Sequence, residues 1–479
     1  MILRVINHPY EFDMKNLCIT FFPHEKIRLE GEEDPVVVTT RRETDGSFFV
    51  SAKVYDVYRE TTAKPEPADE EHLVLSVTLY RLLSGILGFA PPWGVLYGVR
   101  PAKLMHRLCA QLGDDAAVAH FQTAFLTQKS KAELAHEVML HENRSIARSG
   151  PKSFSLYVSI PFCPTRCAYC SFVSHSIEKT HKLMTPYVDL LLRELEETSK
   201  YAKELGLELA TVYFGGGTPT TLSAKDLGRI FSTIEQNFDL SHLMEYTVEA
   251  GRPDTVTRER LEVIRAAGVQ RISINPQSFN DKVLEAIGRR HTAQQTLDAF
   301  ALARDCGFDH INMDFIAGLP EDDLPSFQRS IQTALDLQAE SITVHTLALK
   351  TSAYMVTREQ TFDLKDRLTV SNMVDYAGQT LHGAGYYPYY MYRQSKSLGN
   401  LENVGWCKPG YDCLYNVYMM DETHTVLAVG AGAVTKLRGQ NSGMIERIYN
   451  YKYPYEYIRD FDTLLERKKR IPGFYAEYD

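Results

Sequence analysis

Residues 160–172 read IPFCPTRCAYCSF and place Cys163, Cys167 and Cys170 within one short segment. The spacing is C-x3-C-x2-C, and it follows a strand-like run from Phe154 to Ile160. Three thiolates on one loop can hold three irons of a [4Fe–4S] cluster, which usually has four cysteine ligands. One iron would then lack a protein ligand, and an open coordination position is typical of a metal site that does chemistry.

Other interpretations of these cysteines are weaker. A structural zinc site needs four ligands, commonly as two C-x2-C pairs, and no second pair is present. Cys407 and Cys413 lie six residues apart, which could suggest a second metal site, but without neighbouring ligands we interpret them as ordinary thiols. Three further cysteines are scattered: Cys18, Cys109 and Cys306. Eight cysteines in a long chain do not form a disulfide scaffold, and a cluster loop needs a reducing compartment.

Size and charge indicate a cytoplasmic protein of two or three domains. The chain has 479 residues, 44% of them hydrophobic and 24% charged, with a net charge of −9. The acidic balance argues against a nucleic-acid partner. The start, MILRVINHPYEF, lacks a signal-peptide core. The uncharged stretch between Arg81 and Arg100 imitates a membrane span, but its glycines and prolines favour two buried segments instead.

We divide the chain into three parts. Residues 1–148 form an α+β extension, with strands such as Leu17–Phe22 and Phe48–Val54 first, a linker at 64–67 and helices afterwards. Residues 149–380 alternate strand-like and amphipathic runs, which predicts a partial (β/α)6 barrel. Residues 381–479 form a C-terminal cap on the barrel mouth, in which the basic run 467–470 is a solvated helix face.

Six short strand-like runs make up the predicted barrel. They are Phe154–Ile160, Thr211–Phe214, Glu245–Glu249, Arg271–Ile274, Ile311–Phe315 and Ser341–Thr346. Sites in parallel α/β folds lie at the carboxyl ends of the strands. Every motif with chemical character in this part of the sequence falls at such an end, which indicates one site.

Polar and glycine-rich motifs follow these strands. FGGGTPT contains Gly216, Gly217 and Thr218, whose backbone can approach a ligand closely. It is not a phosphate loop, because no Gly-Lys-Ser/Thr follows. Each of the remaining polar residues could be an exposed loop residue on its own, but together they would face one mouth: Glu249, Gln277, Arg289 and Asp314.

The segments YVSIPFC, FGGGTPT, VEAGRPDT, NPQSFNDKVLEAIGRRH and NMDFIAGLP together resemble the oxygen-independent coproporphyrinogen III oxidases, a family of radical S-adenosylmethionine (SAM) enzymes. The resemblance covers roughly residues 150–440 and is closest to the HemZ-type branch. The chain departs from the heme-chaperone relatives, because GNLENVGWCKPG stands in place of their His-Asn-x-x-Tyr-Trp run.

The resemblance implies a role for each matching residue. Cys163, Cys167 and Cys170 would ligate a [4Fe–4S] cluster whose fourth iron is chelated by SAM. Val434, in GAGAV, would touch a second SAM. The implied contacts of the first SAM are Tyr157, Tyr169, Gly216, Gly217, Thr218, Glu249, Gln277, Arg289 and Asp314.

The implied reaction is the oxidative decarboxylation of coproporphyrinogen III to protoporphyrinogen IX in heme biosynthesis. A 5′-deoxyadenosyl radical would abstract a β-hydrogen from a propionate, and loss of CO2 and an electron would leave a vinyl group, twice per product. We expect a monomer that takes electrons from a flavodoxin or ferredoxin. The substrate carries four carboxylates, for which Arg393, Lys396 and Lys408 are candidate partners; each could equally be a solvated surface charge.

Two alternatives stay open. One is a heme-binding or heme-trafficking protein on the same scaffold, which the complete set of SAM-site residues disfavours. The other is a radical SAM enzyme that acts on another tetrapyrrole, such as a heme-opening methyltransferase.

Overall fold

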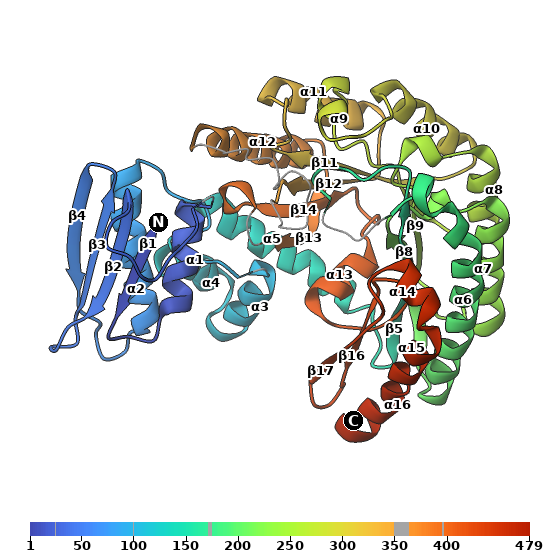
Figure 1. Ribbon diagram of the computed structural model, residues 1–479, viewed down its shortest axis with the longest axis horizontal. Helices are drawn as coiled ribbons and strands as arrows, with labels where there is room; N and C mark the ends of the chain where they lie inside the picture. The colour runs from blue at the N-terminus through green and yellow to red at the C-terminus, as the bar shows by residue number, and fades with distance from the viewer. Residues whose placement is uncertain (24, 99, 171–174, 349–363, 395–396) are drawn as a thin grey trace.

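The computed structural model contains a small N-terminal sheet and one large curved sheet with helices along its outer side (Figure 1). It describes residues 1–23, 25–98, 100–170, 175–348, 364–394 and 397–479. The small sheet has the order β1 (Ile2–Ile6), β2 (Val36–Arg42), β3 (Phe48–Val54) and β4 (Val57–Ala63).

The N-terminal region packs helices on this sheet and then continues as a helical segment. Its helices are α1 (Glu11–Phe21), α2 (Glu71–Leu87), α3 (Pro101–Leu112), α4 (Asp114–Thr123) and α5 (Lys129–Ile146). The predicted strand at Leu17–Phe22 is wrong, because these residues end α1 and bury Leu17, Cys18 and Phe21 in the core of the small sheet. Within the described residues, no helix is both long and apolar enough to cross a membrane.

The large sheet contains all six predicted barrel strands in chain order, side by side and parallel. Their bounds are β5 (Ser153–Ile160), β8 (Glu208–Gly216), β9 (Glu245–Glu249), β10 (Arg271–Ser273), β11 (His310–Ala317) and β12 (Ser341–Thr346). A seventh parallel strand, β15 (Thr425–Val429), pairs with β5 in the register Thr425↔Phe154 to Val429↔Val158. The predicted partial barrel is confirmed, and the C-terminal region lengthens it by one strand.

The outer helices connect these strands and cover the convex side of the sheet (Figure 1). They are α6 (Ile177–Glu204), α7 (Ala224–Asn237), α8 (Arg258–Ala266), α9 (Asp281–Ala286), α10 (Ala293–Asp305) and α11 (Leu324–Asp336). Ser223, Thr257 and Asp323 each accept a hydrogen bond from a backbone amide of the first helical turn. These caps fix where each helix begins after its strand, and hence the length of the loops at the carboxyl ends.

The C-terminal region is hydrogen-bonded into both edges of the same sheet. At one edge, β14 (Glu402–Cys407) pairs antiparallel with β12 and with β13 (Tyr387–Arg393); at the other, β16 (Val434–Arg438) and β17 (Ile445–Tyr449) follow β15. The remaining helices are α12 (Leu364–Gly383), α13 (Leu414–Asp421), α14 (Pro454–Arg459), α15 (Phe461–Lys468) and α16 (Arg470–Tyr478).

One basic residue of the 467–470 run does not lie on a solvated helix face. The side chain of Lys468 is 0% exposed, and its Nζ lies 2.7 Å from Oε1 of Glu194 on α6, which is also 0% exposed. Its neighbour Lys469 is exposed and pairs with Glu466, as we predicted for the whole run. The buried pair therefore attaches α15 to the outer helix α6.

The N-terminal region attaches to the large sheet through a buried polar cluster. Glu402, on β14, accepts hydrogen bonds from Nε1 of Trp93 and Nζ of Lys131, each at 2.7 Å. Lys131 also bonds Asp375 on α12. A buried carboxylate is costly without hydrogen-bond and ion-pair partners. The helical segment supplies those partners, so its packing stabilises this edge of the large sheet.

Candidate functional site

The three clustered cysteines lie on the loop that leaves β5 at its carboxyl end. Cys167 is buried, and Cys163 and Cys170 are half-buried. The amide of Ala168 donates to Ile287 O at 2.9 Å, and the hydroxyl of Thr165 donates to Gly288 O at 3.2 Å. The loop is thus attached to the segment after α9 as well as to its own strand.

The glycine-rich segment after β8 packs directly on this cysteine loop. The amides of Gly217 and Thr218 donate to Ile160 O and Phe162 O at 2.7 and 2.8 Å, and the Thr218 hydroxyl lies 3.4 Å from Cys163 Sγ. A Cβ on Gly217 would come within 2.6 Å of Phe162 O. The amides of Gly217 and Thr218 thus hold the cysteine loop, and the predicted contact of this segment with SAM stays a prediction. Glycine is needed here for close backbone packing.

Glu249 ends β9 as a half-buried carboxylate beside a tyrosine. Its Oε1 accepts a hydrogen bond from the Tyr213 hydroxyl at 2.5 Å. Burial raises the pKa of Glu249 to about 7, and the nearby Asp314 adds to the rise, against the hydrogen bond from Tyr213. The ring of Tyr213 stacks with Tyr157 on β5 and with Tyr415 on α13, at centroid distances of 6.3 and 4.4 Å.

Asp314 lies on β11 in a polar group at the same end of the sheet. Its Oδ1 accepts from Asn312 at 2.7 Å, and Oδ2 lies 3.9 Å from Nε2 of His345 on β12. Burial acts to raise the pKa of Asp314, but His345 and Asn312 outweigh it and hold that pKa below its usual value. Asp314 is therefore a carboxylate at neutral pH, next to a Glu249 that is only partly ionised.

Gln277 connects the segment after β10 to β11 beside Asp314. Its amide donates to Asp314 O at 2.9 Å, and its φ of +68° is rare for a residue other than glycine. Such backbone strain persists only where surrounding contacts enforce it, and it often marks functional positions. Gln277 is buried, so the strained residue belongs to the interior of the mouth.

Arg289 lies behind the cysteine loop rather than free in the mouth. Its Nη2 donates to the Tyr169 hydroxyl at 3.0 Å, and its Nη1 donates to Asn275 O at 2.5 Å. The buried Nε has no hydrogen-bond partner among the described atoms. Arg252, which the sequence interpretation overlooked, donates to Thr165 Oγ1 and contacts Cys167 Sγ. Both guanidinium groups therefore face the cysteine loop.

Val434 begins β16, directly after the loop formed by residues 430–433. Gly430 of this loop packs against Ser159 O near the end of β5, where a Cβ would come within 2.5 Å. Its amide donates to Glu194 Oε2 at 2.8 Å. The Val434 position is thus at the same end of the sheet as the cysteine loop, on the side of β15.

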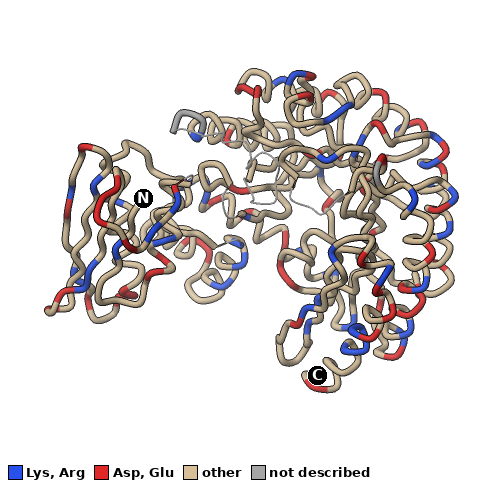
Figure 2. The backbone as a smooth tube through the Cα atoms, viewed as in Figure 1, with Lys and Arg blue, Asp and Glu red and all other residues tan. Residues whose placement is uncertain are grey.

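Two basic residues predicted at the mouth lie elsewhere. Arg393 is 2% exposed, donates to Leu96 O at 2.7 Å and packs over Trp93, so it attaches the N-terminal region instead. Lys408 donates to Gln338 O at 2.9 Å, near the amino end of β12. Lys396 lies outside the described residues. Lys and Arg alternate with Asp and Glu along the outer helices (Figure 2).

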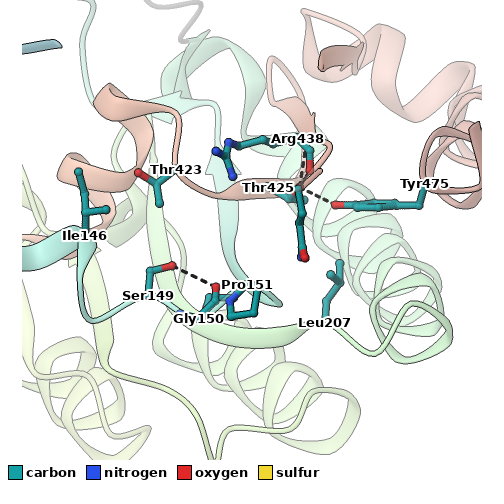
Figure 3. A pocket seen from close by; sticks show the side chains of 11 residues that line it. Ile146, Ser149, Gly150, Pro151, Leu207, Thr423, Thr425, Arg438 and Tyr475 are labelled. Carbon is teal, nitrogen blue, oxygen red and sulfur yellow. Dashed lines mark hydrogen bonds between the residues drawn. The ribbon is translucent and has the colours of Figure 1, made fainter. Parts of the chain in front are cut away.

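A cavity of about 230 Å³ lies at the other end of the large sheet (Figure 3). It is lined by Ser153 and Thr425, the first residues of β5 and β15, and by Arg438 and Tyr475. The described residues around it include no thiol and no carboxylate. Because the cysteines and the half-buried carboxylates Glu249 and Asp314 lie at the carboxyl ends, we place the candidate site there and not in this cavity.

The residues around the loop fit a cluster with three protein ligands. Three thiols lie on one loop, with a threonine hydroxyl near Cys163 and a guanidinium near Cys167. Hydrogen bonds to cluster sulfurs are typical of iron–sulfur sites. By contrast, burial raises the pKa values of Cys407 and Cys413, which favours ordinary protonated thiols.

Comparisons with known proteins identify the family of the chain. Residues 157–334 match the Radical SAM superfamily. The chain is 34% identical over 470 residues to the oxygen-independent coproporphyrinogen-III oxidase-like protein HemZ of Bacillus subtilis, covering 95% of this chain and 94% of that protein. It is 31% identical to the heme chaperone HemW of the same organism, and the match covers 64% of this chain and 79% of that protein. The Escherichia coli coproporphyrinogen III oxidase HemN, a radical SAM enzyme, has the same fold, with a TM-score of 0.51. The two chains are 22% identical, and the match covers 68% of this chain and 72% of HemN.

Proposed function

Since the chain belongs to the oxygen-independent coproporphyrinogen III oxidase-like family of radical SAM proteins, close to HemZ, we propose that it converts coproporphyrinogen III to protoporphyrinogen IX. The family implies a [4Fe–4S] cluster and SAM, which together supply a 5′-deoxyadenosyl radical when bound. The observation that carries the proposal is that the three loop cysteines, Glu249 and Asp314 all lie toward the carboxyl ends of the parallel strands.

We assign the cluster to Cys163, Cys167 and Cys170. Glu249 and Asp314 are the side chains best suited to the ammonium and hydroxyl groups of SAM, because charge-assisted hydrogen bonds are strongest where water is excluded. Gln277 and Tyr157 would orient the cofactor beside them. Arg289, Tyr169 and the glycine segment would act mainly by holding the cysteine loop, as their contacts favour.

The proposed turnover uses two SAM molecules, the second near Val434. The protein would work as a cytoplasmic monomer that receives electrons from a flavodoxin or ferredoxin. Among the described residues, neither Arg393 nor Lys408 is placed to bind substrate carboxylates, so we assign no cation to the propionates.

A second candidate function is heme binding or trafficking, which the 31% identity to a heme chaperone favours. The two functions differ in what they require of the site. A carrier needs no coupling between SAM and a tetrapyrrole. A third possibility, a radical SAM reaction on another tetrapyrrole, keeps the same cofactor site and changes the product.

The experiment that separates them is anaerobic incubation of reconstituted protein with SAM, a reductant and coproporphyrinogen III. We expect protoporphyrinogen IX and about two 5′-deoxyadenosines per product, because each vinyl group needs one hydrogen abstraction. Exposure to oxygen should abolish both products. Tight heme binding without decarboxylation, in protein shown to hold a full cluster, would favour the carrier. Deoxyadenosine without a vinyl product would indicate a different substrate.

A pH dependence of SAM affinity should follow from the raised pKa of Glu249. With an unliganded pKa of about 7, this group is mostly protonated at pH 6 and mostly ionised at pH 8. If the carboxylate binds SAM, affinity is gained as pH rises through 7, by about tenfold between pH 6 and 8. Because SAM itself titrates in the same range, the control is Glu249→Gln, whose affinity for SAM is measured by the same equilibrium binding experiment. Equal pH profiles for the two proteins would contradict the assignment of Glu249.

A further inference from the structure

Arg252 is a buried arginine three residues after the end of β9, and the exposed fraction of the residue is only 3%. Its Nε and Nη2 donate to the two carboxylate oxygens of Asp254, each at 3.0 Å. This bidentate pair fixes the plane of the guanidinium. The remaining nitrogen, Nη1, is thereby directed at the cysteine loop.

Nη1 of Arg252 contacts three atoms on that loop. It lies 3.1 Å from Thr165 Oγ1, 3.4 Å from Thr165 O and 3.7 Å from Cys167 Sγ. Cys167 is itself buried, so no bulk water screens the contact with its sulfur. A cationic N–H is therefore held against one ligand sulfur of the proposed cluster.

The charges around Cys167 are unbalanced without a cluster. Arg252 and Arg289 contribute two buried cations, and Asp254 compensates one of them. No described carboxylate lies within ion-pair distance of Arg289. A [4Fe–4S] core held by three thiolates carries a net negative charge that increases when the core takes up an electron. Within the part of the chain that the structure describes, a bound cluster would therefore supply the counter-charge that Arg289 lacks at ion-pair distance.

From this geometry we infer that Arg252 sets the reduction potential of the cluster through its hydrogen bond to Cys167. The inference rests on the proposed function, because it assumes the cluster. Hydrogen bonds to cluster sulfurs and nearby positive charge stabilise the reduced form, and they are among the main determinants of iron–sulfur potentials. Arg252 therefore favours the uptake of the electron that begins each turnover, without touching SAM or the substrate.

The test is an anaerobic redox titration followed by electron paramagnetic resonance of the reduced cluster. In Arg252→Gln the potential should become more negative, so that at a fixed poise the ratio of reduced to oxidised cluster falls about tenfold, or roughly 59 mV for one electron. In Asp254→Asn it should shift the opposite way, because a negative charge is removed while Arg252 remains. A residue that only holds the loop would not produce shifts of opposite sign.

Two controls separate the electrostatic effect from loop attachment. Thr165→Val removes the hydroxyl that Arg252 binds but keeps the contact with Cys167. Arg260→Gln removes another arginine that bonds backbone carbonyls, at Leu222 and Thr255, away from the cysteines. Both should keep the potential of the unmodified protein.

An unchanged potential in Arg252→Gln with a full cluster would overturn the inference and leave the proposed function intact. If Arg252→Gln fails to hold iron, the Asp254→Asn variant provides the test. An unchanged or more negative reduction potential in Asp254→Asn would also contradict the inference. A wild-type protein that binds no cluster would instead overturn the proposed function.

Discussion

Replacing Cys163, Cys167 or Cys170 by alanine should remove essentially all iron and sulfide from the reconstituted protein, along with its brown absorbance. A cluster with three protein ligands already has one open iron, and a second open position exposes the core to solvent and loss. The measurement is iron and sulfide per protein after anaerobic reconstitution, with about four of each expected in the unmodified chain.

The matched controls are Cys407→Ala and Cys413→Ala. Both thiols are buried in the tyrosine-rich interior, and burial raises their pKa values, so they remain protonated. Cys413 is next to Glu245, whose Oε1 lies 3.4 Å from its sulfur. These variants should keep full iron content. Iron loss in Cys407→Ala as complete as in Cys167→Ala would mean that the ligand assignment is wrong.

The barrel strands were predictable because short strand-like runs alternate regularly with long amphipathic stretches. Two of them, Glu245–Glu249 and Ser341–Thr346, match the predicted bounds. The strand β15, Thr425–Val429, was missed because its last three residues were interpreted together with the following GAGAV as one small-residue run. The strand predicted at Leu17–Phe22 was wrong because tertiary packing outweighed β-propensity. Its β-forming residues end a helix whose apolar face packs on the small sheet.

The candidate site was predictable where one local motif contains the chemistry. The cysteine spacing and the carboxylates Glu249 and Asp314 follow from the strand ends alone. The role of Arg252 was missed although the residue lies within the motif VEAGRPDT. Only the fold brings it to Cys167, which is 85 residues away in sequence. His345 was missed for a related reason, since its neighbour Asp314 belongs to the adjacent strand. Contacts between strand ends depend on register, which the sequence does not give directly.

Lys468→Met should lower the free energy of unfolding by about 3–5 kcal/mol, because it leaves the Glu194 carboxylate buried without its cation. Glu194 also accepts from the Gly430 amide, the Tyr457 hydroxyl and Asn450 Nδ2. A charge left uncompensated there should also loosen the loop before Val434. Chemical denaturation of the apo-protein under anaerobic conditions measures the change.

The double variant Glu194→Gln/Lys468→Met tests the cause. It removes both charges and keeps the shape of the site, so it should be less destabilised than Lys468→Met alone. The neighbouring Lys469→Met is the surface control, with a loss of at most about 0.5 kcal/mol, since its pair with Glu466 is exposed. If Lys468→Met is as mild as Lys469→Met, the buried pair does not hold α15 against α6. If the double variant is the worse of the two, packing rather than charge is responsible, and the loop that begins at Gly430 must be held by its other hydrogen bonds.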